Sequence, residues 1–539
     1  MATFKTTLTV LREQANRIPS SVFFKVPQYD GERQSWKDVS YATCLADVER
    51  SAQAWTRRLQ GTVTEARAVV GVWLKGVSYD DYIHTLGLIR AGYIPQLISL
   101  RMTDPSVVYE LLEKAKAVAL IHDASFTSML HNSPVPTFPG GTLPSEPLEG
   151  QASLSPVCEA SDPDHLVMIL HTSGSTSGIP KLVPITARWV DSLLNKMKHS
   201  RDYAFTPDPE ILIAIGSYMH MGSHMCIWAS LVLGGTMVLP TTIPYSSHEL
   251  SRIIKECGLN RLMVFPPLLS SMFREADKDP DFLALLQGLA SIGYGGMALE
   301  PMDLNWARER GMQPVNFFGS TEMGYAMAGR QSANDSYLEA FPGSTFEFQP
   351  LDDGSGSDSK LLELVIPPES PDCPHQSLRG PDGKFHSGDL FTEIPPGRYL
   401  SQGRADGWIK METSLRCDTS AIEANVIDTC GKDLVHAVAV VGDRRPSPML
   451  VVEPHEQTVP NGVNGNTPHT YEEQLKKDIL ERIMPFHQRR YQHERIQDHR
   501  FIMVVPKGSL PRTATKGNIR RKEVEKTLKD QIDVVYNKA

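Results

Sequence analysis

The chain has 539 residues, more than one hydrophobic core usually supports, so its length predicts at least two domains. Hydrophobic residues make up 41% and charged residues 22%, which argues against a long disordered or fibrous protein. The formal net charge of −9 argues against a broad surface for nucleic acid or anionic membranes, so any anionic ligand must be held by a local site.

The cysteines and the apolar runs bear on the compartment. Seven scattered cysteines without a Cys-x-x-Cys pair predict neither a disulfide framework nor a zinc site, and they favour the reducing cytoplasm. The N-terminal segment lacks the uninterrupted apolar run of a signal peptide, and the longest apolar stretch, residues 225–239, is too short and glycine-broken to span a bilayer. We therefore expect a cytoplasmic protein with no membrane span and no nucleic-acid partner.

Short β-rich runs alternate with helical patterns through the first three fifths of the chain. Strands are predicted, in chain order, at residues 69–74, 117–122, 166–170, 211–216, 236–240, 262–266, 291–296 and 314–319. This alternation is typical of mostly parallel sheets joined by crossover helices.

The pattern changes after residue 406. Polar loops are predicted at 352–360 and 455–470; strands at 435–442, 449–454 and 501–506 accompany an amphipathic helix at 471–484. The expected fold class is therefore α/β, with a large N-terminal domain of several subdomains, residues 1–404, and a small α+β C-terminal lid domain, residues 405–539.

A segment rich in glycine, serine and threonine runs from His171 to Lys181, directly after a predicted strand. Glycine lets consecutive backbone amides point at one ligand, and the hydroxyl groups add donors, so the segment suits a phosphate group. It does not fit a Walker loop, because Lys181 is followed by Leu182 rather than by Ser or Thr. A flexible surface loop has the same composition, so this segment alone leaves both interpretations open.

Six further segments follow this loop along the chain: SYMHMGS (217–223), GYGGMALEP (293–301), NFFGSTEMG (316–324), HSGDL (386–390), GRADGWIK (403–410) and LPRTATKGNIRRK (510–522). The series resembles the motifs of the adenylate-forming superfamily, which comprises acyl- and aryl-CoA ligases, adenylation domains of nonribosomal peptide synthetases, and luciferases. The order Lys516-Gly517 is similar to that of fungal synthetase-like and carboxylate-reductase-like adenylation units. The loop departs from the family pattern by one extra residue, Ser177.

The resemblance implies ATP and Mg²⁺ as ligands. The nucleotide-binding residues that it implies are Thr172, Ser173, Gly174, Ser175, Thr176, Gly178, Lys181, Gly295, Gly296, Phe318, Gly319, Ser320, Asp389 and Arg404. Glu322 would take Mg²⁺ and Lys516 would bridge the acid and the α-phosphate, with Thr321 on the phosphate side; this chemistry depends on positioning and charge neutralisation. His220 would lie at the mouth of the acyl pocket, and Asp406 would be the hinge between the domains.

Each assignment has an ordinary alternative. Asp389 could be a turn residue, Arg404 and Asp406 could form a surface ion pair, and the basic run around Lys516 could be a solvated face. A single nucleotide ligand explains all of these segments together, which favours the functional interpretation.

The expected substrate is a carboxylic acid, aryl or acyl, without an α-amine. Amino-acid-activating relatives pair the substrate ammonium with an aspartate near the segment at 217–223, whereas no aspartate lies between Pro209 and Ala276, and a buried unpaired ammonium is costly. The predicted walls of the acyl pocket are Tyr218, Met219, Met221, Met225, Tyr294 and Met323. Core packing is the alternative for these residues, and a packed wall without a chemical role is the alternative for His220.

The expected function is ATP-dependent formation of an acyl-adenylate with release of pyrophosphate, followed by transfer to an external acceptor. The acceptor stays open between the thiol of CoA, the thiol of a separate carrier protein and an amine, because Ser414 stands where thioester-forming relatives carry a glycine beside the approaching pantetheine. The alternatives are a nucleotide-binding pseudo-enzyme, an amino-acid-activating domain and a luciferase-like oxidation of the adenylate.

Overall fold

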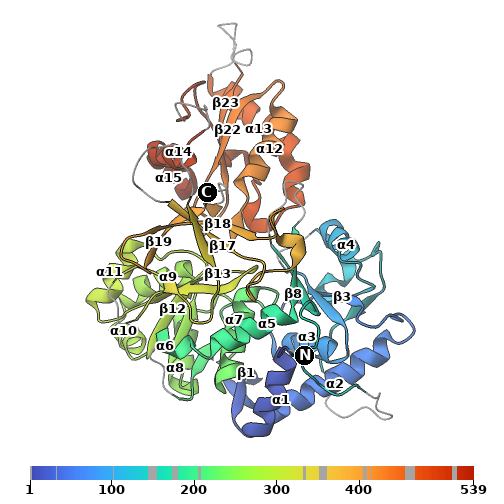
Figure 1. Cartoon of the computed structure of the whole chain (residues 1–539). Helices are drawn as coiled ribbons and strands as arrows, with labels where there is room; N and C mark the ends of the chain where they lie inside the picture. The colour runs from blue at the N-terminus through green and yellow to red at the C-terminus, as the bar shows by residue number, and fades with distance from the viewer. Residues whose placement is uncertain are drawn as a thin grey trace. The chain divides into compact units, whose positions relative to one another are not determined.

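The computed structural model describes residues 3–31, 33–100, 102, 104–143, 154–172, 180–203, 208–331, 335–350, 361–404, 409–413, 415–455, 468–512 and 519–538 (Figure 1). Two compact units are present. The N-terminal unit comprises Met1–Leu100, Leu112–His171 and Leu182–Gly403, and the C-terminal unit comprises Arg101–Leu111, Thr172–Lys181 and Arg404–Ala539.

A six-stranded sheet in the order β6-β5-β3-β4-β7-β8 forms the first layer of the N-terminal half of the chain. Its strands are β3 (Val69–Trp73), β4 (Ile94–Leu97), β5 (Ala119–His122), β6 (Thr137–Pro139), β7 (Leu166–Thr172) and β8 (Lys181–Thr186). Helix α2 (Tyr41–Leu59) precedes these strands, and α3 (Tyr79–Arg90) and α4 (Pro105–Lys114) lie between them. The pairs β3–β4, β3–β5, β4–β7 and β5–β6 are parallel, so the carboxyl ends of these strands share one edge.

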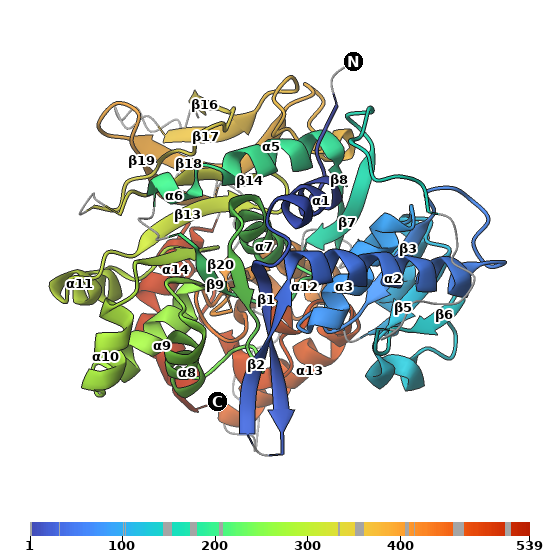
Figure 2. The ribbon, with the colours of Figure 1, turned by 90° about the horizontal axis from the view of Figure 1, so that it is seen from below.

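A nine-stranded sheet has the order β15-β14-β13-β12-β11-β9-β10-β1-β2. Its strands are β1 (Val22–Asp30), β2 (Arg33–Ser40), β9 (Ile211–Ile213), β10 (Thr236–Val238), β11 (Arg261–Val264), β12 (Ser291–Gly295), β13 (Val315–Ser320), β14 (Gly324–Ala328) and β15 (Glu339–Ala340). The middle of the sheet is parallel, and antiparallel pairs lie at both edges, one of which is the hairpin of β1 and β2 (Figure 2).

Helices lie before and between these strands. They are α1 (Thr7–Arg17), α5 (Ala187–Met197), α6 (Ser200–Tyr203), α7 (Met221–Leu233), α8 (Ser247–Cys257), α9 (Pro266–Ala276), α10 (Pro280–Gln287) and α11 (Pro301–Glu309). One core cluster joins strands of both sheets with α1, α2, α3, α5 and α7, while a second cluster packs α8 to α11 on the nine-stranded sheet.

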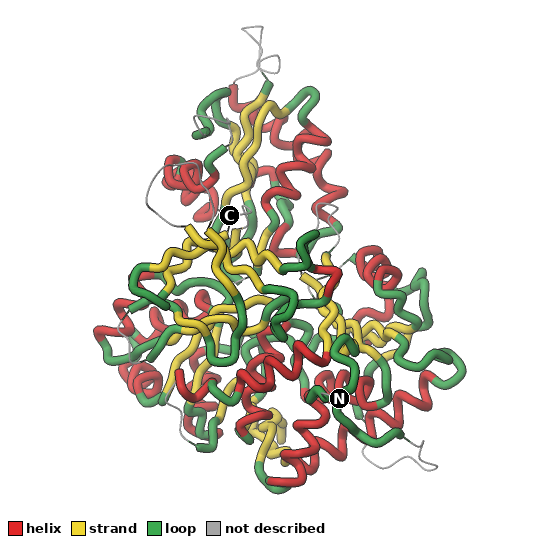
Figure 3. The backbone as a smooth tube through the Cα atoms, in the orientation of Figure 1, coloured by secondary structure: helices red, strands yellow, loops and turns green. Residues whose placement is uncertain are grey.

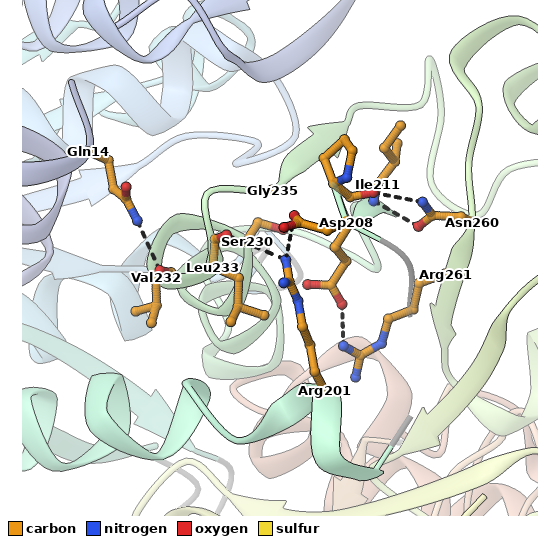
Figure 4. Close-up of polar contacts among 12 residues, drawn as sticks. Gln14, Arg201, Asp208, Ile211, Ser230, Val232, Leu233, Gly235, Asn260 and Arg261 are labelled. Carbon is orange, nitrogen blue, oxygen red and sulfur yellow. Dashed lines mark hydrogen bonds and ion pairs between the residues drawn. The ribbon is translucent and has the colours of Figure 1, made fainter. Parts of the chain in front are cut away.

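Polar side chains tie the amino-terminal ends of β9 and β11 together (Figure 4). Asn260 accepts from the backbone N–H of Ile211 at 2.8 Å and donates to the carbonyl of Pro209 at 2.9 Å. Arg261 forms a buried ion pair with Glu210. This network fixes the edge of the sheet that lies opposite the carboxyl ends of its parallel strands.

A smaller antiparallel sheet completes the N-terminal unit. It contains β16 (Glu347–Pro350), β17 (Leu361–Ile366), β18 (Phe385–Glu393) and β19 (Tyr399–Arg404), in that order. Phe348 of β16 contacts the rings of Phe391 and Tyr399, so aromatic packing joins three of the four strands on one face.

The C-terminal unit has a three-stranded sheet covered on both faces. The sheet comprises β22 (Val435–Val441), β23 (Met449–Pro454) and β24 (Ile502–Val504), and the other elements are the pair β20 (Ile409–Lys410) and β21 (Arg416–Cys417) with α12 (Thr419–Cys430), α13 (Pro468–Gln488), α14 (Arg521–Thr527) and α15 (Lys529–Lys538). Val438, Val440 and Leu450 pack with α12 and α13, whereas Val441 and Val451 pack with α14 and α15. Figure 3 shows helices on both sides of the strands of this unit. Alternate strand residues therefore serve opposite faces, as the two-residue period requires.

Four short 3₁₀ turns lie among the described residues: Ala124–Met129, Gln376–Leu378, Gln492–Glu494 and His499–Phe501.

The predicted fold class is confirmed: each predicted strand overlaps an observed one, and the amphipathic helix expected at 471–484 lies within α13. The expected loop at 352–360 lies outside the described residues. The same holds for residues 456–467 of the loop expected at 455–470. Several strands are shorter than expected. One example is β9, which ends at Ile213 because the residues after it lead toward α7. No helix in the described ranges is long and apolar enough to cross a membrane.

Candidate active site

The carboxyl edge of the nine-stranded sheet brings three of the predicted segments together. β12 is paired in parallel with β13, and Gly295 lies opposite Phe317 in that register. The Gly295-Gly296 pair therefore lies beside the end of β13, which carries Phe318, Gly319 and Ser320. The connection from β9 to α7 leaves the same edge, which is the usual place for a ligand in a parallel α/β sheet.

Glu322 lies in the tight turn between β13 and β14, with Thr321 and Met323 as its neighbours. The backbone N–H of Glu322 donates to the hydroxyl of Ser320 at 3.3 Å. A Cβ atom at Gly319 would lie 2.1 Å from the carbonyl oxygen of Gly324, so only glycine lets the two strands approach this closely. The shape of the turn that carries Glu322 therefore depends on Gly319.

His220, the residue before α7, meets the carboxyl edge of the six-stranded sheet. Its Nε2 lies 3.4 Å from the hydroxyl of Ser99, which follows β4. The backbone N–H of Ser99 donates to Nε2 of His171, near the end of β7, at 2.9 Å. Burial lowers the pKa of His171 to about 3, and the nearby His220 acts in the same direction. His171 is therefore neutral near pH 7, with its proton on Nδ1, because Nε2 is the acceptor.

Asp389 is held on β18, and only 5% of its surface is exposed. Its backbone N–H donates to the hydroxyl of Ser387 at 3.0 Å, and the N–H of Gly388 donates to the carboxylate of Glu363 at 3.0 Å. Two residues further along β18, Phe391 packs edge-to-face on Phe318 with ring centroids 5.1 Å apart. This aromatic contact places the strand of Asp389 against the carboxyl end of β13.

The phosphate loop and the lid carry the remaining predicted residues. Thr172 ends β7, Lys181 is an exposed residue that begins β8, and Arg404 is the last residue of β19. Ser173, Gly174, Ser175, Thr176, Gly178, Asp406 and Lys516, together with Ser177 and Ser414, lie outside the described residues. The roles expected of them remain predictions.

The six predicted pocket residues are all buried. Tyr218, Met219, Met221, Met225 and Met323 belong to the core cluster that joins the two large sheets, and Tyr294 belongs to the cluster under α8 to α11. Tyr294 alternates along β12 with Gly293 and Gly295, so it faces the opposite side of the sheet from them. The structure thus groups five of the six.

Ser99, His171 and Trp189 were not among the residues expected at the site. His171 opens the glycine-rich segment in the sequence, and a polar residue at the end of a buried parallel strand was the available signal. Ser99 donates its own backbone N–H to the distant His171 ring, and Trp189 donates its indole N–H to the distant carbonyl of Glu322, so neither contact leaves a mark in a local motif.

The acidic groups at the site suit a cation that arrives with a nucleotide. Within the described ranges, no cluster of three His, Cys, Asp or Glu side chains could hold a metal ion by itself. Mg²⁺ commonly binds through one or two carboxylates together with substrate phosphates. A single carboxylate at Glu322 fits this donor set.

Comparison with known proteins shows the family of the chain. The model of the AMP-binding enzyme family matches residues 11–345, and that of the AMP-binding enzyme C-terminal domain matches residues 406–539. The AMP-binding domain-containing enzyme iboA of Amanita muscaria is 32% identical over 94% of this chain and 98% of its own length.

Two solved structures share the fold. A double mutant of o-succinylbenzoate-CoA synthetase from Bacillus subtilis superposes with a TM-score of 0.69, at 16% identity over 96% of this chain and 98% of that one. The amide bond synthetase McbA from Marinactinospora thermotolerans also gives 0.69, at 17% identity over 96% and 99% of the two chains. The two family models together with the α/β fold define an adenylate-forming enzyme. The chain belongs to the AMP-binding enzyme family of the adenylate-forming superfamily, and it is an AMP-forming ligase.

Proposed function

We propose that this ligase joins a carboxylic acid without an α-amine to AMP, releases pyrophosphate, and then passes the acyl group to an external thiol or amine. One observation carries the proposal: the segments after β9, β12 and β13 leave the same sheet edge, and His220 there contacts Ser99 beside His171. In the proposal, the carboxyl edge of the nine-stranded sheet is where the expected acyl-pocket segment meets the expected nucleotide segments.

The reaction has two balanced steps. In the first, a carboxylate oxygen attacks the α-phosphorus of ATP, the bond from that phosphorus to the oxygen bridging the α- and β-phosphates breaks, and pyrophosphate leaves with the electron pair. In the second, the acceptor attacks the acyl carbonyl, loses its proton, and AMP leaves. Both steps concentrate negative charge, so catalysis depends on positioned cations and hydrogen-bond donors.

The residues of the chain would divide this work. The glycine-rich loop from Thr172 and the ammonium of Lys181 would hold the β- and γ-phosphates, and Lys516 would stabilise the charge on the α-phosphate. Asp389 would accept from the ribose hydroxyls, a role that suits a carboxylate that is 5% exposed on a well-anchored strand. Mg²⁺ bound at Glu322 would supply additional positive charge on the phosphates.

The histidine pair supports the acyl side of the site. Because His171 is neutral, it accepts from Ser99 and adds no positive charge beside the pocket. Ser99 in turn lies next to the imidazole of His220. This contact would hold the His220 ring at the pocket mouth, as a wall with a defined orientation.

The substrate class follows from the lining near the start of α7. Met219, Met221 and Met225 are buried there, and the first turn of α7 contains no acidic residue. An α-ammonium group in this apolar setting would lack a counter-charge, which is costly in a buried site. An aryl or acyl acid satisfies the same lining.

Acid-dependent exchange of labelled pyrophosphate into ATP tests the proposal, with a panel of aryl, aliphatic, 2-oxo and amino acids. We expect exchange with one class of aryl or acyl acid, and its loss in Glu322→Gln and Lys516→Ala but not in the control Glu309→Gln, an exposed carboxylate on α11. Silence with every acid, while ATP still binds, would instead indicate a nucleotide-binding protein without turnover. Exchange driven by amino acids would contradict the substrate class.

The acceptor is tested next with the identified acid. Incubation with CoA, with phosphopantetheinylated carrier protein and with amines distinguishes a thioester from an amide product by mass. A thioester or an amide would support the proposal, whereas oxygen consumption without an added acceptor would indicate oxidation of the adenylate.

A further inference from the structure

Helix α5 presents one buried face to the segment that carries Glu322. Trp189, Leu193 and Lys196 are spaced by four and three residues, so they share this face, and all three are almost completely buried. The helix begins directly after β8, the strand that follows the glycine-rich loop, and it lies against β14 (Figure 2). It therefore connects the end of β8 to the Glu322 turn.

Trp189 holds the turn at its centre. Its indole N–H donates to the backbone carbonyl of Glu322 at 3.0 Å. Gly324 has the left-handed backbone angle φ of 65°, and a Cβ atom there would lie 3.1 Å from Leu193 and 3.3 Å from Trp189. The helix face thus packs on the turn as closely as a glycine allows, and one directed hydrogen bond sets the peptide plane of Glu322.

Lys196 holds β14, the strand after the turn. Its ammonium donates to the backbone carbonyl of Tyr325 at 2.8 Å, and Ser344 donates to the same oxygen at 3.2 Å. The charge of Lys196 is paired inside the protein with Asp372 at 2.9 Å, and only 2% of the lysine side chain is exposed. Asp372 in turn accepts from Ser192 of α5 at 2.6 Å and from the backbone N–H of Thr345 at 3.0 Å.

A buried ion pair is an inefficient way to gain stability, because desolvation offsets much of the attraction between the charges. Charged groups with several fixed partners do, however, define one geometry. In the Lys196–Asp372 pair, the lysine also donates a hydrogen bond to the backbone carbonyl three residues after Glu322. Trp189 donates to the carbonyl of Glu322 itself.

We propose that Trp189 and Lys196 are positioning residues for Glu322: through its backbone they hold the carboxylate where the metal ion of the nucleotide binds. This inference rests on the proposed role of Glu322. It goes beyond that role by assigning the geometry of the carboxylate to α5, the helix that follows the phosphate loop.

The test is ATP binding by isothermal titration at graded Mg²⁺ concentrations, which requires no acid substrate. Trp189→Phe keeps a large ring and removes only the N–H donor. Trp36→Phe is the matched control, because the Trp36 indole also donates to a backbone carbonyl, that of Leu239, at 3.1 Å in the same unit. The measured quantity is the Mg²⁺ concentration at which half of the Mg²⁺-dependent gain in ATP affinity is reached. Loss of one hydrogen bond to a positioned group predicts that this concentration rises about fivefold in Trp189→Phe and does not change in Trp36→Phe.

The double variant separates positioning from a general structural effect. If Trp189 acts through Glu322, then Trp189→Phe has no further effect on Mg²⁺ dependence in a Glu322→Gln background. A shift that persists in that background, or equal behaviour of Trp189→Phe and Trp36→Phe, would overturn the positioning role alone. Unchanged Mg²⁺ dependence in Glu322→Gln itself would remove Glu322 from the proposed function, and the positioning role with it.

Discussion

Replacement of Lys196 by methionine is expected to destabilise the N-terminal unit by about 3 to 4 kcal/mol at pH 7, because it leaves a buried carboxylate without its cation. The variant loses the ammonium's contacts to Asp372 and to the carbonyl of Tyr325, whereas Asp372 keeps its donors Ser192 and Thr345. The unpaired carboxylate can also become neutral by taking up a proton. Protonating an ordinary carboxyl group at pH 7 costs about 4 kcal/mol, so this cost is the upper limit for the loss of stability caused by the unpaired charge.

The same reasoning fixes the pH dependence. A variant that binds an extra proton on folding becomes relatively more stable as the pH falls, since the cost of protonating a carboxyl group drops to about 1.5 kcal/mol at pH 5. We therefore expect the deficit of Lys196→Met to shrink between pH 7 and pH 5. The double variant Lys196→Met/Asp372→Asn, which lacks the carboxylate, is expected to lose this trend.

Urea denaturation followed by tryptophan fluorescence measures the effect, since every tryptophan except Trp408 lies in the N-terminal unit. Lys198→Met is the matched control, because Lys198 is exposed directly after the same helix, where its ammonium donates to the side chain of Asn195 at 2.7 Å. This substitution should change stability by less than about 0.5 kcal/mol. A loss below about 1 kcal/mol in Lys196→Met, or a deficit that grows as the pH falls, would refute the reasoning.

Two further substitutions probe the site and its surroundings. Gly319→Ala places a Cβ atom 2.1 Å from a backbone oxygen, so we expect a loss of about 1 to 3 kcal/mol in the free energy of unfolding and loss of pyrophosphate exchange. The control Gly288→Ala, whose Cβ would have contacts no closer than 3.4 Å, should keep exchange. Full activity in Gly319→Ala would contradict the need for that close approach. The hydrogen bonds that His386 donates to Asp382 and then to Glu363 raise its pKa, so its stabilisation is present below the unfolded pKa and is lost as the pH rises through the folded pKa. His386→Gln should therefore reduce stability at pH 5.5 but not at pH 8.5, with the exposed His248→Gln as control, and an equal effect at both pH values would rule out the charged pairing.

The parallel sheets could be predicted because their strands are buried on both faces and read as short apolar runs, such as residues 262–266 and 166–170. The antiparallel sheet of β16 to β19 was not predicted as a sheet. Its strands are half exposed, and β18 mixes His386, Ser387 and Asp389 with apolar residues, a weaker signal than a continuous apolar run.

The candidate site divides in the same way. Gly319, Glu322 and Asp389 occur in local motifs, so a resemblance along the chain is enough to nominate them. The contacts of Trp189 with Glu322 and of Ser99 with His171 join residues 133 and 72 positions apart. Such pairs depend on how strands and helices pack, and no local spacing encodes them.

The most direct test of the central claim follows an oxygen atom. With the acid found by exchange, its carboxyl group is labelled with ¹⁸O and the enzyme is allowed to turn over with ATP, Mg²⁺ and acceptor. Attack of the carboxylate on the α-phosphorus predicts that AMP carries one ¹⁸O atom, because the bridging oxygen of the adenylate leaves with AMP. Unlabelled AMP, or formation of ADP with the label in inorganic phosphate, would contradict an acyl-adenylate.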